Sequence, residues 1–328
     1  MVLKPTLKRG ALIAAANWQI TLIQSVADSL FKLLLAVPIL GGIFLVALVL
    51  GAEPTGLMAL EWRELITTIV GALRSHPMVL AAFLLSLAVI VAGGSMFVFL
   101  VKGGTVATLV RSDEEAGPIE QPPLHAVMVA RAGRFSAEGY IDGCRRLFPR
   151  FLRLGCTLMA AYFVSGALYL GVAWTSRTAS WSLTALFTAL FVVWITLVNL
   201  VYLLVQIIIA ADDCTVPAAM RRVGAFVRAE LKGIAAVFGV VLALVICATG
   251  ASILAGTALG LIAFVPFFGL AVLPLQIFAW LMRGVVFQYL GLTAVGAYLR
   301  LYRNYAARPA SHSIRELASS LGSNPIAS

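Results

Sequence analysis

"CTVPAAMRRVGAFVRAELKG", residues 214–233, is a short basic segment between two long apolar runs. Thr215 is a suitable helix cap, and Pro217 fits the first turn that follows it. The basic residues then recur along the expected helix: Arg221, Arg222, Arg228 and Lys232. A helix with a basic and an apolar side is suited to a membrane interface, and the apolar run that follows, at about 233–256, is long enough to cross a bilayer. This pattern predicts a helical membrane protein.

The composition of the chain indicates the same class. Hydrophobic residues make up 61% and charged residues 12%, and the mean hydropathy is +1.00. Soluble domains carry about 45–50% apolar and about 25% charged residues. The net charge of +10 does not indicate a nucleic-acid partner, because the basic residues separate apolar runs instead of clustering on a soluble surface. We therefore expect a polytopic membrane protein.

Windows of about 20 apolar residues identify six candidate spans. They cover about residues 30–51, 78–101, 154–175, 182–210, 233–256 and 266–298. The expected fold is all-α, a bundle of six transmembrane helices within residues 1–308. The first apolar run begins near Leu33 and has full transmembrane length, which is typical of a retained helix and not of a cleaved signal peptide. The uncharged stretch AGTALGLIAFVPFFG, residues 255–269, is either a loop or a break inside the membrane.

The basic residues are distributed asymmetrically around these spans. Nineteen of the 24 lysines and arginines lie on one side, in the segments 4–9, 102–153, 221–232 and 300–315. Cytoplasmic loops are enriched in lysine and arginine. We therefore expect both termini, the loop at 102–135 and the tail at 309–328 to be cytoplasmic. The tail is rich in small polar residues and is expected to be partly disordered.

The arrangement at 214–233 recurs before two other spans. In FSAEGYIDGCRRLFPRFLRLG, residues 135–155, Pro149 should kink a helix whose wet side carries Arg145, Arg146, Arg150 and Arg153. The N-terminal LKRGALIAAANWQITLIQSVADSLFK, residues 7–32, fits the same role before the first span. The sequence thus predicts three hairpins, each led by an amphipathic interfacial helix. The basic residues of the second and third of these helices are expected to contact lipid headgroups, including those of anionic phospholipid.

The passage IIIAADDCTVPAAMRRVGAFVRAELKGIAAVFGVVLAL, residues 207–244, is followed later by the aromatic and basic VGAYLRLYRNYAA, residues 295–307. This layout, over roughly the second half of the chain, resembles bacterial six-helix membrane families of unknown function. It is similar to the membrane domain attached to some glycerophosphodiester phosphodiesterases. The resemblance implies a helical bundle in a bacterial inner (cytoplasmic) membrane and transfers no catalytic residue.

The expected cytoplasmic loop contains an acidic, proline-bearing stretch, RSDEEAGPIEQPP, residues 111–123. Its prolines prevent a continuous helix. We interpret it as a mobile linker, with a docking segment for a partner as the alternative.

Small residues recur inside two of the spans. Gly93 and Gly94 lie in the second span, and Ser252, Gly256 and Gly260 recur every four residues in the fifth. Such spacing lets helices approach closely, and a ligand groove would use the same residues. The four cysteines and three histidines show no metal-ligand spacing, so we expect neither a metal nor another cofactor.

Arg283 is the one basic residue within the spans that lacks an obvious partner, because Lys32 can pair with Asp28 four residues earlier. It lies 17 residues before Arg300, about 25 Å along a helix, which would place it near mid-membrane. An intramembrane charge is by default a functional hypothesis. The alternative is a structural role, in which Arg283 faces the bundle and bonds to backbone carbonyls or to one of four amide side chains: Asn199, Gln206, Gln276 and Gln288.

Three functions remain compatible with these features. The preferred one is a non-enzymatic integral membrane protein that binds lipid or acts as a partner in a membrane complex. A transporter or channel whose pathway includes Arg283 is the first alternative, and it requires a water-filled cavity at that residue. A membrane-embedded enzyme of lipid metabolism is the second, and it requires convergent polar groups at the interface, which the sequence does not show.

Overall fold

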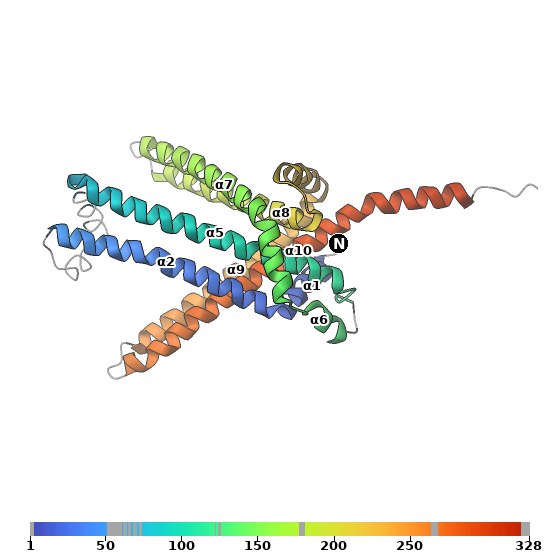
Figure 1. The fold of residues 1–328 in the computed structure, drawn as a ribbon, viewed down its shortest axis with the longest axis horizontal. Coiled ribbons are helices and arrows are strands. Elements are labelled where there is room, and N and C mark those ends of the chain that lie inside the picture. The colour runs from blue at the N-terminus through green and yellow to red at the C-terminus, as the bar shows by residue number, and fades with distance from the viewer. Residues whose placement is uncertain are drawn as a thin grey trace, which may run out of the picture. The chain divides into compact units, whose positions relative to one another are not determined.

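A computed structural model describes residues 3–50, 61, 64, 67, 71, 74–121, 123, 126–176, 181–263 and 268–322. Within these residues it contains eight helices of defined extent and no strand (Figure 1). They are α1 (Leu3–Ala16), α2 (Trp18–Leu50), α5 (Pro77–Glu115), α6 (Ala126–Ala132), α7 (Ala137–Ser176), α8 (Trp181–Asp212), α9 (Val216–Ala263) and α10 (Phe268–Gly322). The all-α prediction is confirmed.

Six of the described helices, α2, α5, α7, α8, α9 and α10, are long and apolar enough to cross a membrane. The chain is therefore a multi-pass membrane protein. No helix break occurs at Gly256 or Gly260, since α9 continues to Ala263, and residues 264–267 lie outside the described part. At the other end, α10 continues past residue 308 to Gly322.

The chain divides into two compact units, residues 23–101 and residues 1–22 with 102–328. In the first unit, α2 and α5 pack as an antiparallel pair, each placing a glycine against a phenylalanine of the other. A Cβ atom on Gly94 would lie 2.2 Å from the ring of Phe31, so only glycine fits there. The predicted packing role of Gly94 is confirmed, whereas that of Gly93 is wrong, because nothing lies within 4 Å of the corresponding position. The expected pair of Asp28 and Lys32 forms at 2.6 Å.

The core of the second unit lies where the ends of several helices meet. We call this region the hub, and it comprises α1, residues 102–121, α7 as far as Leu154, α8 from Tyr202, α9 as far as Val237, and α10 from Leu292 to Tyr302. Its largest enclosed side chains are Phe151, Phe226 and Tyr298. In contrast, only 11% of the most apolar window of α9 is buried within the protein. Packing is concentrated in the hub, and the spans leave their apolar surface for lipid.

Helices α5 and α7 cross closely in the hub. A Cβ atom on Gly104 would lie 2.5 Å from Sγ of Cys144, and one on Gly143 would lie 2.7 Å from Cβ of Ala107. The apolar side of the amphipathic segment 135–155 therefore packs against α5 and not against lipid. The segment is also continuous with the third span in α7, which contains Pro149 and bends between its first turns and its membrane part (Figure 1).

The amphipathic segment 214–233 forms the first part of α9. A non-helical residue, Glu230 with φ −121° and ψ 27°, divides this part from the span, close to the boundary expected from the sequence. Its apolar side faces the hub, where the ring of Phe226 lies 5.4 Å from that of Tyr302.

The N-terminal segment differs most from expectation, because α1 is packed inside the hub against α10. The backbones touch at two glycines: a Cβ on Gly10 would lie 2.5 Å from the carbonyl oxygen of Thr293, and one on Gly296 would lie 2.9 Å from Cα of Gly10. Ile13 is fully buried. The expectation that its basic side faces lipid headgroups is wrong for Arg9, which is enclosed by protein together with Ile13 and Ala14, whereas Lys4 is exposed.

Candidate functional site

A groove of about 520 Å³ separates α9 from α10 within the spans. The small residues Ala248, Ser252 and Gly256 recur every four positions and so share one side of α9, where they leave space. Arg283 and Phe287 lie on the facing side of α10, also four residues apart. The groove thus combines apolar walls with a single charged residue among the residues that line it.

The serine and glycines of the fifth span line or adjoin this space and do not pack against another helix. Nothing lies within 4 Å of a Cβ placed on Gly256 or on Gly260. The packing interpretation of these two glycines is therefore wrong, whereas Ser252 and Gly256 fit the alternative of a ligand groove.

Arg283 exposes its side chain to the groove. Its guanidinium carbon lies 5.7 Å from the ring centre of Phe287, a cation–π distance. Among the residues that the structure describes, no hydrogen bond or ion pair reaches Arg283. The expected bonding to amides is wrong: Asn199, for example, donates to the carbonyl of Ile195 and accepts from the hydroxyl of Tyr162.

The depth of Arg283 in a bilayer remains a prediction. Residues 292–299 of α10 are buried in the hub, so counting from Arg300 includes protein as well as membrane. Phe268 begins α10 at its other end, and from there to Arg283 is about 22 Å at 1.5 Å per residue. If the hydrocarbon core of about 30 Å begins at Phe268, an upright α10 places Arg283 within about 8 Å of the boundary nearest the hub, which a long side chain can reach.

The neighbouring hairpin of α7 and α8 contrasts with this open groove. The indole nitrogen of Trp194 donates to Oγ of Ser165 at 2.9 Å. The hydroxyl of Tyr169 lies 3.0 Å from Oγ1 of Thr188, and its ring stacks on Phe191 with centres 4.5 Å apart. The α7–α8 hairpin is closed by its own polar and aromatic side chains.

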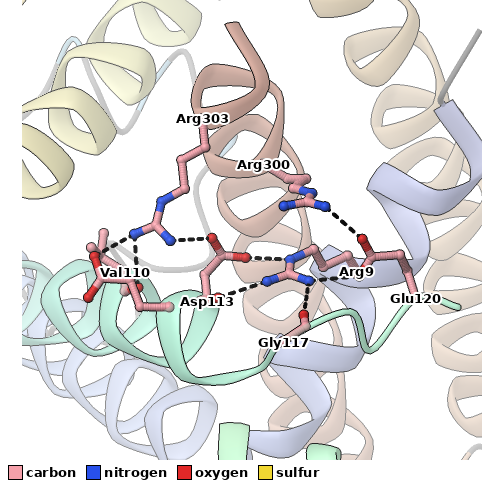
Figure 2. Close-up of polar contacts among 8 residues, drawn as sticks. Arg9, Val110, Asp113, Gly117, Glu120, Arg300 and Arg303 are labelled. Carbon is pink, nitrogen blue, oxygen red and sulfur yellow. Dashed lines mark hydrogen bonds and ion pairs between the residues drawn. The ribbon is translucent and has the colours of Figure 1, made fainter. Parts of the chain in front are cut away.

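A second cluster of charges lies in the hub, around the buried Arg9 (Figure 2). Its guanidinium bonds Asp113 at 2.5 Å and Glu120 at 2.7 Å, and it also donates to the backbone carbonyls of Asp113 and Gly117. Arg9 and Asp113 are only 3% and 2% exposed. A buried charge needs such partners, because desolvation without pairing costs several kcal/mol.

Two arginines of α10 complete this cluster (Figure 2). Arg300 bonds Glu120 at 2.8 Å, and Arg303 bonds both Asp113 and Glu114 at 2.7 Å. Three arginines thus meet three carboxylates, and an adjacent cavity of about 470 Å³ is lined by groups that are already engaged. The cluster joins α1, the acidic stretch 111–121 and α10 and leaves no spare charge for a ligand.

The acidic stretch is therefore anchored and is not a mobile linker in its described part. Burial disfavours the charged form of Glu120, but the hydrogen bond and charge of Arg9, followed by the charge of Arg300, outweigh it and hold the pKa below its ordinary 4.5. Burial likewise opposes the charge of Arg9, yet Asp113 and Glu120 raise its pKa. Sequence reasoning missed this cluster. The available signal was a run of acids in a chain that has only 14.

The eight basic residues that were predicted to contact lipid headgroups lie on α7 and α9. Two of them are engaged, because Arg150 pairs with Asp213 and Arg222 pairs with Asp212. The other six are exposed and form no ion pair with any described residue: Arg145, Arg146, Arg153, Arg221, Arg228 and Lys232. We call these six the free basic set.

The chain was compared with known proteins. No protein-family model, no curated protein and no solved structure matches it. The resemblance of residues 207–244 and 295–307 to bacterial six-helix membrane families therefore remains a prediction.

Proposed function

We propose that this chain is a non-enzymatic integral protein of a bacterial inner membrane that binds anionic phospholipid through the basic surface of its hub. The observation that carries the proposal is the free basic set on α7 and α9. Seven of the nine acidic residues of the hub region are bound to other arginines or to Arg150 and Arg222: Asp113, Glu114, Glu115, Glu120, Asp212, Asp213 and Glu230. They are consequently not available to neutralise the free basic set. The other two, Glu138 and Asp142 on α7, are exposed and leave the six cations in excess.

The position of this set favours a membrane surface as its partner. Both helices continue directly from these basic segments into apolar spans. Each lysine or arginine near an anionic surface contributes about 1 kcal/mol, so six could together contribute up to about 6 kcal/mol. Cytoplasmic segments are enriched in lysine and arginine, so this basic surface also supports a cytoplasmic hub. Both termini would lie on the cytoplasmic side, since α1 and residues 292–302 of α10 belong to the hub.

The chemistry of the hub supports a role without catalysis. Arg9, Asp113 and Glu120 converge, but their charges are engaged with one another and with Arg300 and Arg303. The transport alternative also has less support than lipid binding, because the walls of the groove at Arg283 are apolar except for Ser252 and Gln276. Such walls suit an acyl chain better than a path for water or ions.

The proposal is tested by extracting the full chain into copolymer nanodiscs without detergent and measuring the co-extracted lipids by mass spectrometry. We expect the anionic fraction to exceed that of the bulk membrane. Replacing the six members of the free basic set by glutamine should return that fraction to the bulk value. Arg74→Gln is the matched control, since this exposed arginine was placed on the opposite side by the charge distribution. A wild-type fraction equal to the bulk value would refute the proposal.

A further inference from the structure

We infer that the groove between α9 and α10 is a binding site for one anionic phospholipid, with an acyl chain along α9 and the phosphate on Arg283. This inference rests on the proposed function for the membrane and its orientation. It adds a defined intramembrane site that is separate from the free basic set.

The dimensions of the groove fit one lipid chain. Its lining extends from Ala248 to Leu259 on α9 and from Gln276 to Phe287 on α10. Eleven residues correspond to about 16 Å along a helix. One leaflet of a bilayer has a hydrocarbon thickness of about 15 Å, half of the core. An acyl chain of the leaflet nearest the hub can therefore lie along the groove for nearly its whole depth.

The charge of Arg283 selects an anionic ligand. A lone cation in hydrocarbon is costly, and the ring of Phe287 offsets only part of that cost. The described part of the chain provides no carboxylate or other polar partner for it. A phosphodiester matches a guanidinium well, because two parallel N–H groups can bond two phosphate oxygens.

The depth of Arg283 in the bilayer would let the protein bind the headgroup and an acyl chain of the same lipid. Near the boundary on the hub side, its side chain can extend to the headgroup region. On the opposite wall Ser252 lies about level with Arg283, and Gly256 lies one turn farther from the hub, where the acyl chain would run. A dissolved phosphate ion would use Arg283 alone and gain nothing from these apolar walls.

The α7–α8 hairpin shows what the groove lacks. There, Trp194 bonds Ser165 and Tyr169 stacks on Phe191 across the two helices. In the α9–α10 hairpin, small residues face an arginine that forms no ion pair or hydrogen bond with any described residue, so a ligand would both fill the space and balance the charge.

The test uses two variants of the full chain that act on different parts of the lipid. Arg283→Gln removes the charge and keeps a polar side chain. Gly256→Leu fills the groove without a backbone clash, because nothing lies within 4 Å of its Cβ position. The controls are Arg74→Gln, an exposed cation outside the free basic set, and Gly239→Leu, a change on α9 outside the groove lining at another open glycine. Delipidated protein is titrated with phosphatidylglycerol or phosphatidylcholine, and native mass spectrometry counts the bound lipids.

We expect wild type and both controls to retain one phosphatidylglycerol. Arg283→Gln should reduce its affinity at least about fivefold, the factor that corresponds to about 1 kcal/mol for one arginine. The same change should weaken phosphatidylcholine less, because its choline cation already balances the charge of its phosphate. Gly256→Leu should weaken both lipids. Equal retention of phosphatidylglycerol by all four variants would overturn the inference. A dimer without bound lipid would also overturn it, if Arg283→Gln abolished that dimer. Addition of inorganic phosphate should not displace the lipid, and displacement would indicate a simple anion site. The proposed function has a separate readout, the bulk anionic enrichment, which depends on the free basic set and not on Gly256.

Discussion

Replacing Arg9 by methionine should destabilise the hub by about 3 kcal/mol. Removing one partner of a buried ion pair costs about 3–5 kcal/mol, because the other charge is left buried without compensation. Here the cost should fall at the lower end of that range. Asp113 keeps Arg303 at 2.7 Å and Glu120 keeps Arg300 at 2.8 Å, while the backbone carbonyl of Gly117 loses its bond to Arg9.

The measurement is reversible unfolding in mixed micelles, with the fluorescence of Trp18, which follows α1 directly, as the probe. Lys4→Met is the matched control: it removes an exposed cation from the same helix and should change stability by less than about 0.5 kcal/mol. A double-mutant cycle of Arg9→Met with Asp113→Asn should give a coupling of about 1–3 kcal/mol. Equal stabilities for Arg9→Met and Lys4→Met would refute the conclusion that the charge cluster stabilises the hub.

Three further predictions concern other contacts. The pKa of Glu120 is lowered in the folded protein, so its contribution to stability is present above its ordinary pKa of 4.5 and is lost as the pH falls through the lower folded value. Acid titration of wild type should show this loss of stability, and Glu120→Gln should make the pH dependence flatter. Gly104→Leu should cost about 1–3 kcal/mol or more through overpacking at the α5–α7 crossing, whereas Gly93→Leu on the same helix should be tolerated, as melting temperatures in nanodiscs would show. Trp194→Phe should cost about 0.6–1.7 kcal/mol by loss of the bond to Ser165, and an equal effect in a Ser165→Ala background would contradict that bond.

Much of the fold followed from the sequence because hydrocarbon imposes a simple rule on length and polarity. The six spans and the boundary near Glu230 could be located from apolar runs and a helix cap at Thr215. The packing of α1 could not, because a basic amphipathic segment looks the same whether its charge faces lipid headgroups or buried carboxylates. Only the distant acids that meet Arg9 distinguish these cases.

The candidate site shows a similar division. Arg283 could be singled out because an unpaired charge in an apolar span is rare. Its level in the membrane stays a prediction. The count from Arg300 includes protein, and nothing in the sequence shows that residues 292–299 are enclosed. The role of Gly256 also could not be decided, because the same four-residue spacing suits close packing and an open groove. Whether a second helix fills that space depends on tertiary structure.

Arg9 pairs with Asp113 and Glu120, and these carboxylates also pair with arginines of α10. This arrangement has a consequence for biosynthesis. The hydroxyl of Tyr289 bonds the carbonyl of Ala11, a residue 278 positions earlier. At about 5–20 residues per second, a ribosome needs roughly 15–60 s to make the chain between these contacts. During that time α1 has left the ribosome without its final neighbours in α10. The last helix to be synthesised therefore decides when the first one is buried, and a chain that stops before α10 lacks Arg300, Arg303 and the backbone contact at Gly296 that enclose α1 in the folded protein.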